Sequence, residues 1–260
     1  MTNPAVVPTA QVMGAQLPML GLGTWQSRGD DAYTAVTTAL ELGYRHVDTA
    51  TMYGNQAQVG RALADAGLPR DEVFVTTKLP PDAAGRERAT LAQSLDQLGL
   101  DHLDLWLIHW PPRGHPAPEV WQQLVDARDE GLVRAIGVSN YSPAQLDELA
   151  EATGVMPSVN QIPYSPTDHD PVLLAAHRER GVVVEGYSPL KRTPLDHDVL
   201  ADTAANHGVS PAQVVLRWHL QRDVVVIPKS VRRERLAENL DIFGFTLTLE
   251  ELDAIDALGS

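Results

Sequence analysis

The sequence has 260 residues, of which 43% are hydrophobic, and it carries a net charge of −14. The absence of cysteine excludes disulfides, thiol nucleophiles and cysteine-ligated metals, and the acidic balance argues against a nucleic-acid-binding surface. No run approaches the roughly 20 apolar residues of a membrane span, and the first residues lack the basic and apolar regions of a signal peptide. We therefore expect a cytoplasmic protein with neither a membrane nor a nucleic-acid partner.

The first elements in chain order are a hairpin, a strand and a helix. Residues 6–18, "VVPTAQVMGAQLP", are expected to form a short β-hairpin that turns near Gly14. The string "LGLGT" at residues 20–24 predicts a strand. Residues 30–42 place apolar side chains on one helical face and are followed by Gly43, and a glycine in that position is typical of a helix C-terminus.

The alternation of strand and helix then continues along the chain. Short apolar strands are predicted at residues 44–50, 73–79, 103–109, 133–140, 157–162, 182–188 and 224–230. Helices are predicted at residues 55–66, 86–98, 118–130, 142–153 and 170–180, and another begins at 210. The string "SPAQ" occurs at 142–145 and again at 210–213, and it predicts an N-cap serine, a proline in the first turn and a capping-box glutamine.

Eight strands, each followed by a helix, predict an α/β fold of the (β/α)8 TIM-barrel type. The alternative is a doubly wound sheet, which should carry G-x-G-x-x-G after a strand. The nearest string, "GLGTWQ", lacks the third glycine and opens no helix. No linker divides the chain, so we expect one barrel domain over residues 1–260, with a short N-terminal hairpin and an unusually short C-terminal tail.

Four polar residues follow the ends of three neighbouring predicted strands. Asp48, Lys78 and His109 close strands, and Tyr53 lies in the loop after Asp48. Each has an ordinary structural explanation when taken alone. Asp48 could cap a strand end and Tyr53 could be a loop hydroxyl. Lys78 could extend its stem along the surface, and His109 could be a hydrogen-bonded core histidine. Because active sites of such barrels lie at the carboxyl ends of the strands, the four together favour a catalytic site.

These side chains suit proton transfer to a carbonyl oxygen. Tyrosine has a pKa of about 10 and is a poor acid at neutral pH, but the ammonium of Lys78 should lower that pKa. Asp48 would keep Lys78 charged, and His109 could donate a hydrogen bond that orients the substrate. The set contains no nucleophile or reductant of its own, so we expect a cofactor to supply hydride.

Ordered strings along essentially the whole chain resemble the aldo-keto reductases, in particular the bacterial diketogluconate-reductase-like group. The strings are "LGLGTW", "GYRHVDTATMYGN", "TTKL", "LDLWLIHWP", "VRAIGVSNY", "VNQI", "GYSPL" and "IPKSVRRERLAEN". The resemblance implies that Asp48, Tyr53, Lys78 and His109 form a catalytic tetrad with Tyr53 as the acid. It also implies NADPH/NADP as cofactor. The expected cofactor-binding residues are Thr24, Ser139, Asn140, Gln161, Tyr187, Ser188, Leu190, Lys229, Ser230, Val231, Arg235, Glu238 and Asn239.

Within that set, the resemblance implies that Ser139, Asn140 and Gln161 bind the nicotinamide carboxamide and that Tyr187 stacks under the nicotinamide ring. The basic segment at 227–239 would hold the adenosine 2′-phosphate at the start of a helix, which attracts anions. If Ser230 caps that helix, its arginines stand where the helix dipole disfavours cations, and a bound phosphate would offset that cost. Arg232 and Arg233 fall outside the family pattern and are expected to be solvated surface charges.

Substrate contacts are less specific. Trp25 and Trp110 are expected to give the pocket apolar walls, whereas Trp121 and Trp218 lie in helical patterns and are expected in the core. Pro163 and Ser165 replace residues common in the family, and the short tail leads us to expect a permissive site for several aldehydes and ketones. The loop aspartates of the two "DHD" strings are expected to cap helices, and we predict no metal site.

Two other functions fit the same residues. One is a regulatory protein that binds NADP(H) with little turnover, and the other is a lyase that uses Lys78 as a Schiff-base lysine. The leading interpretation is an NADP-dependent oxidoreductase that acts on a small carbonyl substrate. Nothing in the sequence demands a second subunit, so a monomer is expected.

Overall fold

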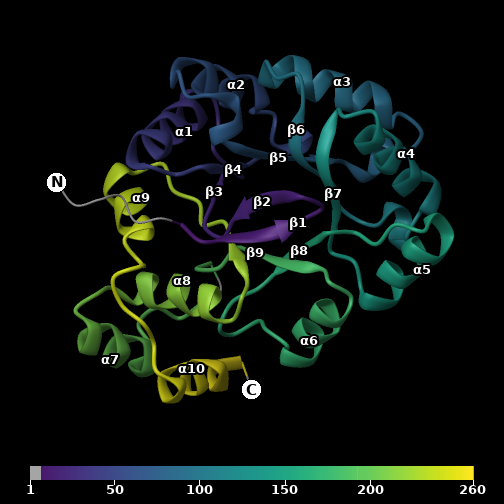
Figure 1. Cartoon of the computed structure of the whole chain (residues 1–260). Helices are drawn as coiled ribbons and strands as arrows, with labels where there is room; N and C mark the ends of the chain where they lie inside the picture. Colours follow the sequence, from purple (N-terminus) through teal and green to yellow (C-terminus); the bar gives the residue numbers. More distant parts are fainter. Residues whose placement is uncertain (1–6, 192, 260) are drawn as a thin grey trace.

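The computed structural model describes residues 7–191 and 193–259, and its centre is a ring of parallel strands surrounded by helices (Figure 1). Eight strands pair in chain order, from β3 to β10. The end strands are joined through a parallel bridge between Leu20 and Val226, which closes the sheet into a barrel. The strands are β3 Leu22–Gly23, β4 His46–Asp48, β5 Phe74–Leu79, β6 Leu103–Ile108, β7 Val133–Ser139, β8 Val159–Pro163, β9 Val183–Tyr187 and β10 Val225–Val226. The predicted (β/α)8 barrel is confirmed.

The helices cover the outside of this barrel and mostly follow the predicted segments. They are α1 Asp30–Leu42, α2 Gln56–Asp65, α3 Glu87–Leu98, α4 Pro118–Asp129, α5 Pro143–Thr153, α6 Pro171–Glu179, α7 Asp198–His207, α8 Pro211–Gln221, α9 Arg233–Leu240 and α10 Leu249–Asp256. Short 3₁₀ turns are η1 Thr51–Tyr53, η2 Arg70–Glu72, η3 Pro81–Ala83, η4 Pro112–Gly114 and η5 Ala257–Gly259. The connection from β9 to β10 holds two helices, α7 and α8, of which only α8 was predicted from the sequence.

The expected hairpin consists of β1 Thr9–Val12 and β2 Ala15–Pro18. Met13 and Gly14 form its turn with φ values of 46° and 86°, as a two-residue turn of the type favoured in hairpins requires. The hairpin lies across the middle of the barrel in Figure 1, and its Val12 and Leu17 pack against interior residues such as Leu105. It therefore closes the amino-terminal end of the barrel. The expectation that no signal peptide is present concerns residues 1–14, of which residues 1–6 lie outside the described residues.

Several helix ends follow the local sequence signals, but in the second "DHD" string His197, and not an aspartate, caps α7. Ser142 and Ser210 each form a capping box, with Gln145 and Gln213 respectively, and the Asp170 side chain caps α6. Trp121 and Trp218 are fully buried, as predicted. None of the described helices is both long and apolar enough to span a membrane.

Candidate active site

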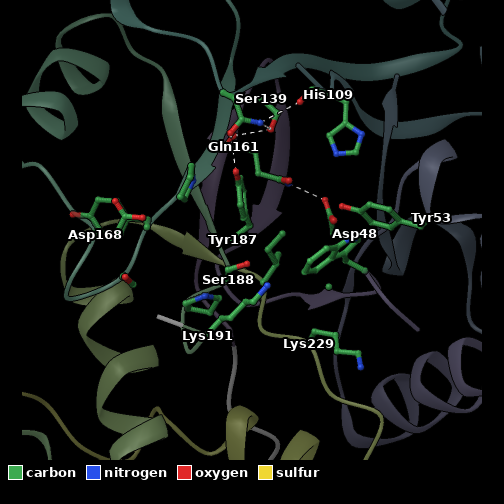
Figure 2. Close-up of a pocket in the computed structure, with 18 of the residues that line it drawn as sticks. Asp48, Tyr53, His109, Ser139, Gln161, Asp168, Tyr187, Ser188, Lys191 and Lys229 are labelled. Atoms are coloured by element: carbon green, nitrogen blue, oxygen red, sulfur yellow. Dashed lines mark hydrogen bonds between the residues drawn. The ribbon is translucent and has the colours of Figure 1, made fainter. Parts of the chain in front are cut away.

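A cavity of about 450 Å³ opens at the carboxyl ends of the strands, where the sequence placed the site (Figure 2). Asp48 at the end of β4, Tyr53 in η1 and His109 just after β6 line one side of it. Lys78, on β5, is fully buried behind them. The four side chains predicted to act together therefore lie together, because parallel strands in register deliver their last residues to one rim.

Tyr53, Lys78 and Asp48 form a connected hydrogen-bond network. The Lys78 ammonium donates to Asp48 Oδ1 at 2.6 Å and to the Thr49 carbonyl at 2.9 Å. The same Nζ lies 3.4 Å from the Tyr53 hydroxyl. Asp48 is 1% exposed and Lys78 0%, so the ion pair is shielded from water and its geometry is fixed by these bonds.

Burial and neighbouring charges shift the pKa values of Lys78 and Tyr53 in opposite directions. Burial lowers the pKa of Lys78, but the charges of Asp48 and Tyr53 outweigh it, and the pKa of the lysine is raised above its usual value. Burial raises the pKa of Tyr53 more than Lys78 lowers it. The prediction that Lys78 lowers the tyrosine pKa thus has the right sign for that interaction but the wrong net result, because the sequence could not show how deeply the phenol is buried.

His109 is held as a neutral imidazole. Burial and the Lys78 charge lower its pKa to about 3. Its ring meets the Tyr53 ring edge to face, with centroids 5.8 Å apart. Within the described residues its Nδ1 is buried and has no hydrogen-bond partner. A neutral ring beside the phenol can donate one hydrogen bond to an acceptor in the cavity.

The opposite side of the cavity carries hydroxyl, amide and aromatic groups from β7, β8 and β9 (Figure 2). Ser139 Oγ donates to the Gln161 carbonyl at 2.8 Å, and the Asn140 amide donates to Ser139 Oγ at 2.8 Å. The Tyr187 hydroxyl donates to Asn140 Oδ1 at 2.8 Å. Asn140 and Ser188 have φ values of 65° and 57°, so the backbone turns sharply just after β7 and β9. The expected carboxamide-binding residues are thus gathered at one wall.

An adjacent cavity of about 570 Å³ continues from the first towards α9. It is lined by the expected residues Ser188, Leu190, Lys229, Ser230, Arg235, Glu238 and Asn239. Val231 is not among its lining residues and packs against the core. Thr24 lines neither cavity; its hydroxyl donates to the Asp48 carbonyl at 2.9 Å. The structure therefore brings all but two of the expected cofactor residues to the two cavities.

The start of α9 differs from the arrangement considered in the sequence. The helix begins at Arg233, and Arg232 is its N-cap residue with no side-chain cap. Ser230 lies before it and accepts from the Arg232 N–H at 3.1 Å. Arg233 forms an exposed ion pair with Glu41 at 2.7 Å, which agrees with its expected role as a surface charge. Among the described residues, no side chain caps the start of α9, which leaves its first N–H groups available to an anion.

Two features were not anticipated. Glu185 is fully buried inside the barrel next to Gln161, and Lys191 stacks on Trp25 with its Nζ 4.9 Å from the ring centroid. The signal for Glu185 was present in the string "VVVEGYS", since an ionisable side chain is rare in a strand covered on both faces. Across residues 7–191 and 193–259, no three histidine or acidic side chains are grouped so that they could hold a metal ion.

Comparison with known proteins identifies relatives along nearly the whole chain. The sequence profile described as "Aldo/keto reductase family" matches residues 19–260. A 2,5-diketo-D-gluconic acid reductase B from a Corynebacterium species is 45% identical over 92% of this chain and 88% of its own length. Methylglyoxal reductase DkgA of Escherichia coli is 42% identical over 99% and 94%. The crystal structure of a Bombyx mori aldo-keto reductase in complex with NADP superposes with a TM-score of 0.90 at 37% identity and covers 98% of this chain and 94% of that one.

Proposed function

The chain belongs to the aldo/keto reductase family, and on that premise we propose that it reduces an aldehyde or ketone to an alcohol with NADPH as the hydride donor. The observation that carries the proposal is the chain Tyr53–Lys78–Asp48 beside His109 at the cavity rim. Two relatives are named as reductases of 2,5-diketo-D-gluconic acid and of methylglyoxal, both of which are carbonyl compounds.

The two cavities fit the proposed cofactor. The hydroxyl and amides of Ser139, Asn140 and Gln161 suit a carboxamide, and the Tyr187 ring offers an aromatic face. The exposed cations Lys229 and Arg235, together with the uncapped start of α9, suit a phosphate at the far end. When bound, NADPH supplies the hydride that no side chain of this protein can provide.

We propose that Tyr53 donates the proton to the carbonyl oxygen of the substrate. Its hydroxyl lines the cavity and lies 3.4 Å from Lys78, so the ammonium can stabilise the phenolate as the proton leaves. Asp48 keeps Lys78 charged, and the raised pKa of Lys78 argues against a Schiff-base role, which needs the free amine. Neutral His109 is positioned to donate to the carbonyl oxygen and orient it.

The substrate class follows from the rim of the cavity. Trp25 and Trp110 line it and remain 43% and 46% exposed, as does Met52 at 60%. Such a wide apolar rim places few directional demands on the substrate, so we propose activity on several small aldehydes and activated ketones. We also propose that the protein is a monomer located in the cytoplasm. Light scattering tests the oligomeric state.

The proposal is tested by NADPH depletion over a panel of carbonyl compounds, with Tyr53→Phe as the variant. Removing the hydroxyl should lower kcat by roughly 10²–10⁴-fold, as expected for loss of a general acid, while the NADPH dissociation constant stays unchanged. A variant that retains the wild-type rate contradicts the assignment of the acid. If the wild-type protein binds NADPH without turnover, it is instead a regulatory protein that senses the cofactor.

A further inference from the structure

A buried polar chain crosses the barrel interior below the cavity. Gln161 on β8 donates through Nε2 to Asp48 Oδ2 at 2.9 Å and to Glu185 Oε2 at 2.6 Å. Gln161 and Glu185 are paired in register on neighbouring strands, and Glu185 is 0% exposed. The proposed mechanism uses Asp48 but gives Glu185 no role, although burying a carboxyl is costly.

The two bonds determine how the Gln161 amide is oriented. An amide nitrogen carries two hydrogens, and both are occupied by carboxyl oxygens. These two bonds do not involve the amide oxygen of Gln161, so that oxygen can still accept a hydrogen bond. Gln161 also lines the cavity. Without Glu185, only the bond to Asp48 would hold the amide, and rotation could exchange its oxygen and nitrogen.

We propose that Glu185 is a positioning residue that holds the Gln161 amide with its oxygen available to accept a hydrogen bond from the nicotinamide carboxamide. This inference rests on the proposed function, because it presumes that the cofactor's carboxamide binds at the wall of Ser139 and Gln161. It assigns Glu185 an effect on the nicotinamide half of the cofactor and none on the phosphate half.

The charges around Glu185 indicate which carboxyl carries a proton. Burial raises the pKa of both Asp48 and Glu185, and the nearby Asp48 charge adds to the effect on Glu185, whose pKa is raised to about 8. Lys78 donates to Asp48 at 2.6 Å, so Asp48 is the carboxyl that ionises, and Glu185 is the neutral acid at pH 7. The Lys78 ammonium and the Asp48 carboxylate then balance each other's charge.

His46, on the far side of Glu185, is compatible with this protonation state. Burial lowers its pKa to about 3, so its ring is neutral. Its Nδ1 lies 3.2 Å from the Pro18 carbonyl, which can only accept, so Nδ1 carries the hydrogen. The Nε2 atom must therefore accept, and it lies 3.5 Å from Glu185 Oε1 and 3.3 Å from the Thr76 hydroxyl. At that distance Glu185 Oε1 forms no hydrogen bond with His46 or with any other described residue, and a buried oxygen without a donor is less costly in a neutral acid than in a carboxylate.

The first test measures binding, with Glu185→Leu as the variant and adenosine 2′,5′-bisphosphate as the control ligand. This ligand has the 2′-phosphate but no nicotinamide. NADPH affinity should fall roughly 10-fold, the usual effect of losing one hydrogen bond of this kind, while affinity for the bisphosphate stays within about twofold. Unchanged NADPH binding overturns the inference, as does an equal loss for both ligands, which would mark a structural role. A wild-type protein that binds neither ligand instead overturns the proposed function.

The conservative variant Glu185→Gln should restore NADPH binding to within about twofold of wild type at pH 7. Its side chain is neutral and can accept from Gln161 through its amide oxygen, as the neutral acid does through Oε2. If this variant is as weak as Glu185→Leu, Glu185 acts as an anion and the assigned neutral form is wrong.

A second readout needs no cofactor and remains valid if Glu185→Leu fails to fold. The pKa of Glu185 rises from about 4.5 in the unfolded chain to about 8 in the folded one. The folded state therefore holds the extra proton between these values, and wild type should lose stability relative to Glu185→Gln as the pH rises through this window. The difference in melting temperature should become constant above pH 8. A difference that does not vary with pH contradicts the neutral acid.

Discussion

The two ends of the proposed cofactor site differ in how their charges are held. At the nicotinamide end, Asp48 and Lys78 are buried and bonded to each other at 2.6 Å. At the phosphate end, Lys229 and Arg235 are exposed, and no side-chain bond or ion pair ties either of them to another described residue. The first end is organised before any ligand arrives, whereas the second offers free charge to an anion. This contrast predicts that substitutions in the Asp48–Lys78 pair change the chemical rate, whereas substitutions of Lys229 or Arg235 change cofactor choice.

The largest effect is expected from Lys78→Met, which removes the cation beside Tyr53. We expect kcat to fall by about 10²–10⁴-fold, because the phenolate loses its stabilising charge. The variant should also be destabilised, by roughly 3–5 kcal/mol, since Asp48 is left without its partner in the barrel interior.

The double variant Asp48→Asn/Lys78→Met separates these two effects. With both charges removed, the melting temperature should recover towards that of wild type, while kcat stays low. Recovery of activity along with stability would show that Lys78 serves only to balance Asp48. Thermal melts and NADPH-depletion assays on the two variants make the comparison.

The rim residues and the bonds across the barrel interior differ in how far the sequence predicts them. The positions of Asp48, Lys78 and His109 at one rim follow from strand length and parallel pairing, and both can be inferred from local patterns. The bond between Gln161 and Asp48 joins residues 113 positions apart across the closed barrel. Its existence depends on barrel diameter and side-chain reach, which no sequence period encodes.

The start of α9 illustrates a second limit of local patterns. The string "IPKSVRR" contains a serine in a plausible capping position, but the helix begins three residues after Ser230, at Arg233, with Arg232 as its N-cap. Ser230 instead accepts a hydrogen bond from the Arg232 N–H. The choice between neighbouring caps depends on how the chain leaves β10, which local propensity does not determine.

The next largest effect concerns cofactor choice at the phosphate end. Lys229→Ala or Arg235→Ala should weaken NADPH binding by roughly 10- to 100-fold, because each removes a charge-assisted bond to the 2′-phosphate. NADH lacks that phosphate, so its affinity should stay within about twofold. Titration of both cofactors against each variant measures the ratio. Equal losses for NADPH and NADH would mean that these residues are only surface charges.

The smallest effect is expected from Arg233→Ala, a matched control for Arg235→Ala because it removes the same charge two residues away on α9. Arg233 pairs with Glu41 across an exposed surface, where both side chains are more than half accessible, and such pairs contribute at most about 1 kcal/mol. NADPH affinity should therefore change less than about twofold at fixed ionic strength. If Arg233→Ala lowered NADPH affinity as much as Arg235→Ala, the phosphate end would attract the cofactor through its overall positive potential. It would then differ from the buried Asp48–Lys78 pair in charge density, and not in particular contacts to the phosphate.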